Sequence, residues 1–206
     1  MDDKNYSKLK KCNNDASCVY NASLNQPALD ASKEKSVLLC NNTVEKVTKE
    51  IVIDNIKNII NKVSEDEQLI IFFSGHGEDV NNEFALVMYD SFDTKEESFI
   101  KISEIDKLLS SCNAKEKLFF IDACFSGLVL EDSKSKSNSR KTIEKLIIES
   151  RGINIIASSR SNQCSIEKSP SDKSLFTHFL ILALEGDKRA QKDYYLSIFS
   201  LYEYIA

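Results

Sequence analysis

Residues 118–127, LFFIDACFSG, begin as an apolar run and change abruptly at Asp122 to a segment of polar and small residues that contains Cys124. Residues 69–77, LIIFFSGHG, follow the same plan and place His76 between two glycines. Short, continuously apolar runs are typical of strands that are covered on both faces. Because functional groups gather at the carboxyl ends of such strands, the two stretches predict a thiol and an imidazole at two strand ends.

The rest of the chain alternates between helix and strand patterns. After Thr48, a residue type that often caps helices, one apolar stripe recurs at helical spacing: Val52, Ile56, Ile59, Ile60 and Val63. We expect further helices at 15–24, 142–149 and 175–184, and one capped by Ser103 or the residue beside it. The other candidate strands are 36–40, 84–89, 99–102 and 153–157. This order predicts an α/β fold with a mainly parallel sheet.

Composition narrows the class of protein. The 206 residues are 42% hydrophobic, which suits a single domain, 1–206, with a large core. A net charge of -5 provides no basic face for nucleic acid. Six cysteines without a C-x-x-C pair and only two histidines leave few zinc ligands and indicate free thiols in a reducing compartment. No leader or membrane span is recognisable, so we expect a cytoplasmic protein that binds neither nucleic acid nor membrane; no particular oligomeric state is predicted.

Cys124 and His76 can act together chemically. A thiol is a strong nucleophile as the thiolate, and a nearby imidazole favours that form by taking the proton. The backbone N–H groups of Gly77 and Cys124 could then hold a developing oxyanion. The alternative is structural, with the cysteine as a small core residue and the histidine as part of a glycine turn. The other histidine, His178, falls within the predicted helix 175–184, where we expect it to pack or face solvent.

These segments resemble the caspase-like cysteine peptidases, closest to the branch of metacaspases and bacterial caspase homologues. The resemblance rests on Ser74-Gly75-His76-Gly77 and on Asp122-Ala123-Cys124-Phe125-Ser126-Gly127, and it extends over most of residues 5–205. The separation of His76 and Cys124 is also close to the roughly 50 residues typical of caspases. The resemblance implies a three-layer sandwich with helices on both faces of the sheet. It also implies a cysteine endopeptidase that acts on proteins or peptides.

The resemblance assigns a substrate pocket as well. It implies that Asp15, Asp122, Ser74 and Ser158 bind the side chain that precedes the scissile bond, and that this side chain is Arg or Lys. Two carboxylates partly removed from water attract a cation and repel Asp. Caspases that cut after Asp resemble this chain less, because they carry Gln two residues before the cysteine. The alternatives are that Asp122 caps the turn that follows it and that Asp15 is a helix N-cap.

Residues 131–141, EDSKSKSNSRK, contain no large apolar side chain and predict a flexible, solvated loop. In caspases a cleavable segment after the nucleophile separates two subunits. An enzyme that cuts after basic residues could therefore cleave itself here, and the candidate positions are Lys134, Lys136, Arg140 and Lys141. The alternative is an ordinary surface connection.

Calcium activates many metacaspases, but this chain has Ser103-Glu104 where the family often has paired aspartates. Asp90, Asp93 and Glu131 could supply oxygen ligands, although acidic loop residues are usually only solvated. We expect no required cofactor or metal.

The resemblance also suggests that both ends are cut. The family's apolar first strand has no counterpart before Asn5, and 197–206 resembles the start of a last helix. Either the chain is a fragment, another segment fills the gap, or the placement of 5–16 is wrong. An inactive caspase-like module that binds partners through the same cleft is therefore the rival function, and another type of cysteine hydrolase is a third.

Overall fold

The computed structural model describes residues 9–93, 96–125, 153–158, 172–192 and 195–205. Its central sheet has the order β3-β2-β1-β4-β5. The strands are β1 (Gln68–Asp79), β2 (Phe84–Leu86), β3 (Ile100–Lys101), β4 (Glu116–Phe125) and β5 (Asn154–Ala157). β1, β4 and β5 run parallel, whereas β2 and β3 pair antiparallel beside them. The predicted α/β class with a mainly parallel centre is confirmed.

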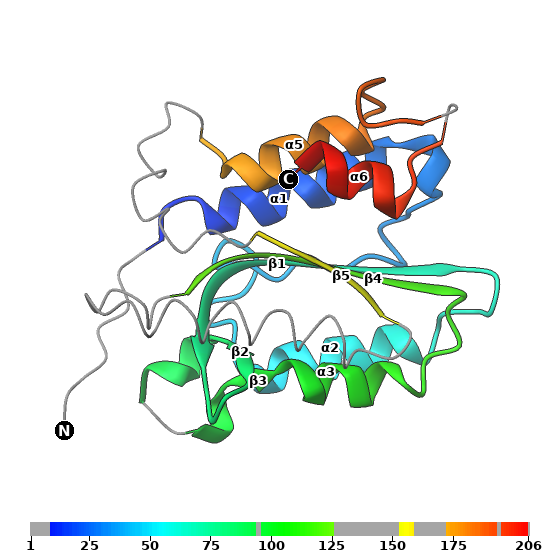
Figure 1. The fold of residues 1–206 in the computed structure, drawn as a ribbon. Helices are drawn as coiled ribbons and strands as arrows, with labels where there is room; N and C mark the ends of the chain where they lie inside the picture. The colour runs from blue at the N-terminus through cyan, green and yellow to red at the C-terminus, as the bar shows by residue number, and fades with distance from the viewer. Residues whose placement is uncertain (1–8, 94–95, 126–152, 159–171, 193–194, 206) are drawn as a thin grey trace.

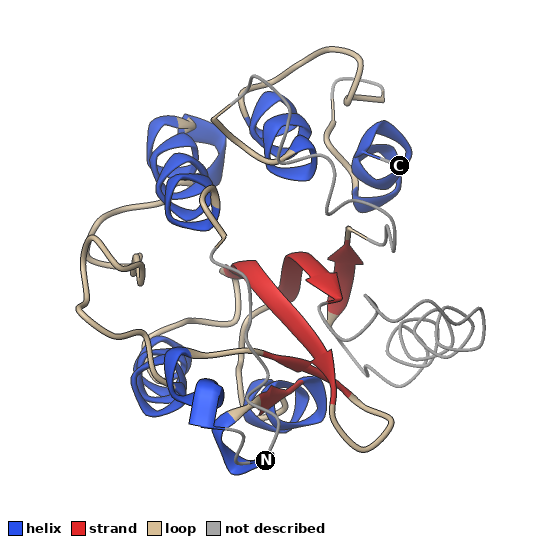
Figure 2. Ribbon diagram, turned by 90° about the vertical axis from the view of Figure 1, so that its left-hand side faces the viewer, coloured by secondary structure: helices blue, strands red, loops and turns tan. Residues whose placement is uncertain are grey.

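Helices cover both faces of the sheet, as Figures 1 and 2 show. One layer contains α2 (Lys49–Ile60) and α3 (Ile102–Leu109), and the other contains α1 (Cys12–Asn25), α5 (Leu175–Leu184) and α6 (Ile198–Ile205). Short 3-10 turns occur at Pro27–Leu29, Tyr89–Asp93 and Glu96–Ser98. No described helix is long and apolar enough to cross a membrane.

Alternation along the strands builds two separate cores. Phe119 and Ile121 of β4 pack with the α2 and α3 layer, while Phe120 packs with the α1, α5 and α6 layer. This is the outcome expected for a continuously apolar strand, because successive side chains point to opposite faces. All three side chains are at most 3% exposed.

β1 is less buried than β4 although its sequence is equally apolar. Ile70, Ile71, Phe72 and Phe73 are only partly buried. Among the described residues, β1 has β4 along one side, and its other side is paired with a strand only at 77–79, where β2 lies. The hydrogen bond from Val87 N–H to His76 O, 3.0 Å, extends that contact by one residue.

Several element boundaries differ from the predicted ones. β1 and β4 do not stop before their motifs: β1 continues through Ser74-Gly75-His76-Gly77, and β4 through Cys124. The strands continue because 74–77 pair in register with 122–125, and 77–79 pair with β2.

The predicted strand 36–40 is wrong. This segment belongs to no strand and ends in a bend at Cys40. The hydroxyl of Thr43 donates to Leu38 O at 2.9 Å and accepts from Cys40 N–H at 3.0 Å, so the backbone of this segment turns onto a neighbouring side chain.

Of two predicted helix N-caps, one is confirmed and one is wrong. Thr48 caps α2 as predicted, since its hydroxyl accepts from Ile51 N–H at 3.5 Å. The expected cap at or beside Ser103 is wrong, because α3 begins at Ile102 with Lys101 in the N-cap position. There the carboxylate of Glu83 accepts Ser103 N–H at 2.9 Å instead. The predicted helix 142–149 lies outside the described residues.

The unequal burial of β1 and β4 predicts unequal sensitivity to truncation. Phe119→Ala is expected to lower the free energy of unfolding by about 3–5 kcal/mol, because the ring is fully enclosed. Phe73→Ala, on the same face of the partly covered strand, is expected to cost distinctly less. Urea denaturation followed by circular dichroism measures both. Equal losses would contradict the assignment of β4 as the more deeply buried strand.

Candidate functional site

The two candidate catalytic residues lie opposite each other on adjacent strands. β1 and β4 are parallel, and their register pairs Ser74 with Asp122 and His76 with Cys124. Neighbouring strands lie about 4.8 Å apart. The sheet therefore brings together two residues that are far apart in the sequence, at the carboxyl ends of its central strands.

Asp15 and Asp122, called here the acidic pair, lie beside these strand ends. Asp15 comes from α1 and Asp122 from β4, and the two are close enough that the charge of Asp122 acts on Asp15. The hydroxyl of Ser74 donates to Asp15 Oδ2 at 3.2 Å, and the hydroxyl of Ser158 donates to Asp122 Oδ1 at 3.0 Å. The four residues predicted to form a substrate pocket are thus gathered in one network.

The structural alternative for Asp15 is wrong. Asp15 lies inside α1, whose N-cap is Lys11, so it is not the cap of its own helix. Asp122 accepts hydrogen bonds from Ser158, Ser174 and Thr177, and the turn that it was expected to cap lies outside the described residues.

Two members of this network, Ser174 and Thr177, were not predicted as site residues from the sequence. Ser174 caps α5 by accepting Thr177 N–H at 3.0 Å, and its hydroxyl also donates to Asp122 Oδ2. The hydroxyl of Thr177 donates to the same oxygen at 2.9 Å. The backbone N–H of Ser174 donates to Asp15 Oδ1 at 3.0 Å. A Ser three residues before Thr at the start of an apolar helix was a recognisable cap signal, but nothing in it indicated carboxylate partners.

Further hydrogen bonds attach the N-terminal end of α1 to the segment that leads into α5. Lys11 Nζ donates to Lys173 O at 3.3 Å, and Asn14 Nδ2 donates to Asp172 O at 3.0 Å. Figure 1 shows the first turns of both helices at the same end of the sheet as the carboxyl ends of β4 and β5. The acidic pair is therefore held by three elements that meet at this end.

Asp15 is a buried carboxyl group. It is only 1% exposed. Burial raises its pKa from 3.8 to about 6, the N–H of Ser174 opposes that shift, and the charge of Asp122 adds to it. Near neutral pH the negative charge of the pair therefore lowers the free energy of unfolding.

The two glycines in the His76 motif leave room for aromatic rings within the strand rather than forming a turn. A Cβ on Gly77 would lie 2.3 Å from Cε2 of Phe84, and a Cβ on Gly75 would lie 2.5 Å from Cζ of Phe73. Gly77 lies within β1, in register with Leu86 and Phe125. The expected glycine turn around His76 is wrong, and the oxyanion role of Gly77 stays a prediction.

His178 has the place expected for it. It lies on α5, is exposed, and packs edge-on against Phe179 with ring centroids 5.4 Å apart. The calcium hypothesis stays a prediction. Asp90 accepts Lys49 N–H at 3.1 Å, and in the described part of the chain no group of three or more His, Cys, Asp or Glu side chains could hold a metal ion.

Other predictions fall outside the described residues. These are Glu131, the loop 131–141 with its four candidate cleavage positions, and the side chains of Asp93 and Cys124.

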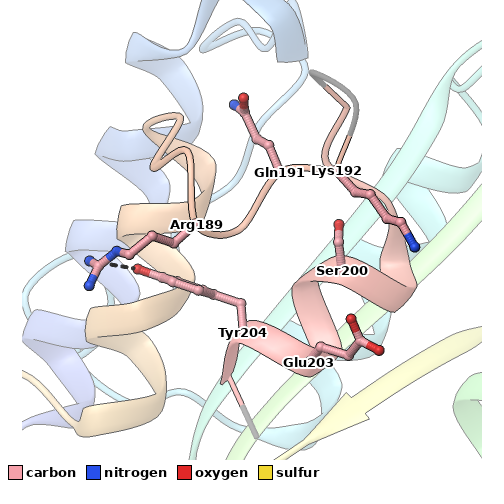
Figure 3. Close-up of a pocket in the computed structure, with 6 residues that line it drawn as sticks. All are labelled: Arg189, Gln191, Lys192, Ser200, Glu203 and Tyr204. Carbon is pink, nitrogen blue, oxygen red and sulfur yellow. Dashed lines mark hydrogen bonds between the residues drawn. The ribbon is translucent and has the colours of Figure 1, made fainter.

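A surface pocket of about 470 Å³ lies elsewhere, between α6 and the loop before it (Figure 3). It is lined by Arg189, Gln191, Lys192, Ser200, Glu203 and Tyr204. Arg189 and Tyr204 both bind the carboxylate of Asp187, at 2.6 and 2.7 Å, which joins α6 to the end of α5. The pocket contains none of the predicted site residues.

Comparison with known proteins agrees with this architecture. The family model for the caspase domain matches residues 2–203. The crystal structure of protein GSU0716 from Geobacter sulfurreducens superimposes with a TM-score of 0.57 at 16% sequence identity, covering 96% of this chain and 79% of that one. At this identity the likeness concerns the fold alone. No curated protein sequence matches the chain.

The buried carboxyl group predicts a stabilising substitution. Because the pKa of Asp15 is higher in the folded chain than in the unfolded chain, its ionised form destabilises the fold above about pH 6 and has no such effect below about pH 4. Asp15→Asn keeps an acceptor for Ser174 N–H and is expected to raise the free energy of unfolding by about 1–3 kcal/mol at pH 7.5. Urea denaturation at pH 7.5 and 4.5 measures the effect.

The matched control is Asp54→Asn on α2, whose carboxylate is largely exposed and should change little. A gain for Asp15→Asn that is the same at both pH values, or no gain at pH 7.5, would contradict the assigned cost of burying this charge.

Proposed function

Because the chain belongs to the family of proteins with a caspase domain, matched over residues 2–203, we propose that it is a cysteine endopeptidase that cuts after Arg or Lys. The observation that carries the proposal is the register of β1 and β4. It sets His76 beside Cys124 and Ser74 beside Asp122, so a candidate dyad and a candidate cation pocket share one pair of strands. Family membership supports a cysteine peptidase, and the acidic pair supports the basic specificity.

The proposed reaction follows from the two side chains. His76 takes the thiol proton of Cys124, and the thiolate attacks the scissile carbonyl carbon. The N–H groups of Gly77 and Cys124 are the proposed donors to the oxyanion, a contribution of roughly 3–4 kcal/mol for each donor. The imidazolium returns its proton to the leaving amine, and water then releases the acyl group with His76 again as base. No metal is required for these steps.

Specificity follows from charge at the acidic pair. A guanidinium or ammonium group that enters beside Asp122 is attracted by both carboxyl groups, whereas a substrate Asp would add a third negative charge. Protein or peptide substrates with Arg or Lys before the scissile bond are therefore expected. This preference supports placing the chain in the metacaspase and bacterial branch of the family.

One observation favours the rival function, an inactive module that binds partners through the same cleft. Among the described residues, the side of β1 away from β4 has no strand partner along 68–75, so on that side the strand is supported only from His76 onward, by Val87 and β2. If that support is too weak to hold the dyad, the cleft can bind peptides without cutting them.

Active-site labelling separates the two functions. An acyloxymethyl ketone that carries Arg is expected to alkylate Cys124, because the reagent places its electrophilic carbon at the nucleophile while its guanidinium occupies the pocket. Peptide mass spectrometry locates the label. His76→Ala should reduce labelling by about 10²–10⁴-fold through loss of the base, while His178→Ala, at an exposed position of α5, should not change it. Labelling that is equal with and without His76 would refute the dyad, and adding calcium to parallel samples tests whether the ion is needed.

Self-processing follows from the basic residues of 131–141. Purified chain is expected to be cut after one or more of Lys134, Lys136, Arg140 and Lys141, while the Cys124→Ala chain stays intact under the same conditions. Mass spectrometry of the products identifies the bonds. If both chains stay equally intact under conditions where the labelling reagent reacts, self-cleavage is wrong.

A further inference from the structure

We propose that the acidic pair, whose two carboxyl groups Ser174 holds side by side, is proton-linked, so that a cationic side chain entering the pocket expels one proton from the pair. This inference rests on the proposed function and adds a property of the pocket: its affinity for basic side chains depends on pH. It also gives Ser174 a positioning role toward the substrate pocket in addition to its role as the cap of α5.

The contacts of Ser174 place the two carboxyl groups side by side. Its backbone N–H donates to Asp15 Oδ1 at 3.0 Å, and its hydroxyl donates to Asp122 Oδ2. Two acidic groups that share one donor residue cannot both ionise without mutual repulsion. The geometry by itself therefore favours retention of one proton while the pocket is empty.

The neighbouring charges do not remove that repulsion. The described hydrogen bonds to the pair come from hydroxyl groups and from one backbone N–H, all of them neutral. Among the described residues, the cations whose charge acts on Asp15 are Lys11 and Lys173. However, Lys11 Nζ is hydrogen-bonded to Lys173 O, and Lys173 Nζ is paired with Asp172 at 3.1 Å.

Groups from β1 complete the surroundings of the pair. Ser74, the β1 residue bonded to Asp15, is neutral. His76, a titratable group, lies two residues further along the same face of that strand.

The two carboxyl groups have different tasks. Asp122 is partly exposed, so an entering cation can reach it, whereas Asp15 is buried. Burial raises the pKa of Asp15 to about 6, and the charge of Asp122 adds to that effect. We assign the retained proton to Asp15. When an amidinium, guanidinium or ammonium group arrives, the proton leaves Asp15 for solvent, and no other bond forms or breaks.

Calorimetry tests this linkage directly. Benzamidine is a suitable probe because its amidinium stays charged across the pH range used, and the Cys124→Ala chain binds without reacting. Titrations in two buffers of different ionisation heat give the number of protons released on binding. We expect close to one proton per benzamidine at pH 5, close to none at pH 8, and about tenfold weaker binding at pH 5.

Two substitutions identify the groups involved. Asp15→Asn should abolish the proton release and the pH dependence. Ser174→Ala, which removes the hydroxyl that favours the ionised form of Asp122, should extend the proton release to higher pH. Thr48→Ala removes the equivalent cap from α2 and controls for loss of stability; it should leave both quantities unchanged.

The outcomes separate this inference from the proposed function. If benzamidine binds with equal affinity at both pH values and releases no proton, the linkage is wrong while the basic specificity survives. If benzamidine does not bind at pH 8 to a folded chain, the proposed function and the linkage both fall. Proton release that persists in Asp15→Asn would also overturn the assignment to Asp15.

Discussion

The hydrogen bonds of Ser174 to two carboxyl groups are the interaction on which the arrangement of this site depends. Through them the first turn of α5 is fixed to α1 by way of Asp15 and to the central strand β4 by way of Asp122. Without donors at this point, two buried or half-buried acidic groups would face each other unsupported, which is costly in a low-dielectric interior. The same bonds bring a helix N-terminus, which carries partial positive charge, against that negative charge.

Burial of the Asp15 carboxyl group lowers the stability of the fold at the candidate site. A domain of this size is stable by only about 5–15 kcal/mol, and an amide side chain in place of Asp15 would keep an acceptor for Ser174 N–H at lower cost. Natural chains tolerate such local costs mainly where a site needs them. A buried carboxyl group with a raised pKa, beside the strand ends that carry His76 and Cys124, is therefore an argument for function in its own right.

Much of the fold could be predicted from residue pattern, and the reasons are local. The sequence pattern predicts β1, β4 and α2 because each element buries apolar side chains that recur at strand or helix spacing. Whether such a segment is a helix or a strand is therefore determined by a few neighbours in sequence. The prediction of a strand at 36–40 is wrong because the pattern is equally compatible with a loop held by Thr43. The predicted ends of the strands are also wrong. β1 continues past His76 because β2 and β4 pair with it there.

The candidate site could likewise be predicted only in part from the sequence. Asp15, Asp122, Ser74 and Ser158 could be named beforehand from the family resemblance, and the structure gathers them. Ser174 and Thr177 could not be assigned, because they lie 52 and 55 residues from their partner Asp122 in the chain and their bonds to it depend on how α5 docks. Predicted roles for residues 131–141 concern a part of the chain that the structure does not describe.

The central claim is that one pair of strands supports both a nucleophile and a pocket for basic side chains. The most direct measurement is kcat/KM for three peptides that differ only in the residue before the scissile bond, Arg, Lys or Asp, with the Cys124→Ala chain as blank. The account predicts that the Arg and Lys peptides are cut at least about 100-fold faster than the Asp peptide, and that the blank cuts none. Faster cleavage after Asp, or equal cleavage by the blank, would contradict it.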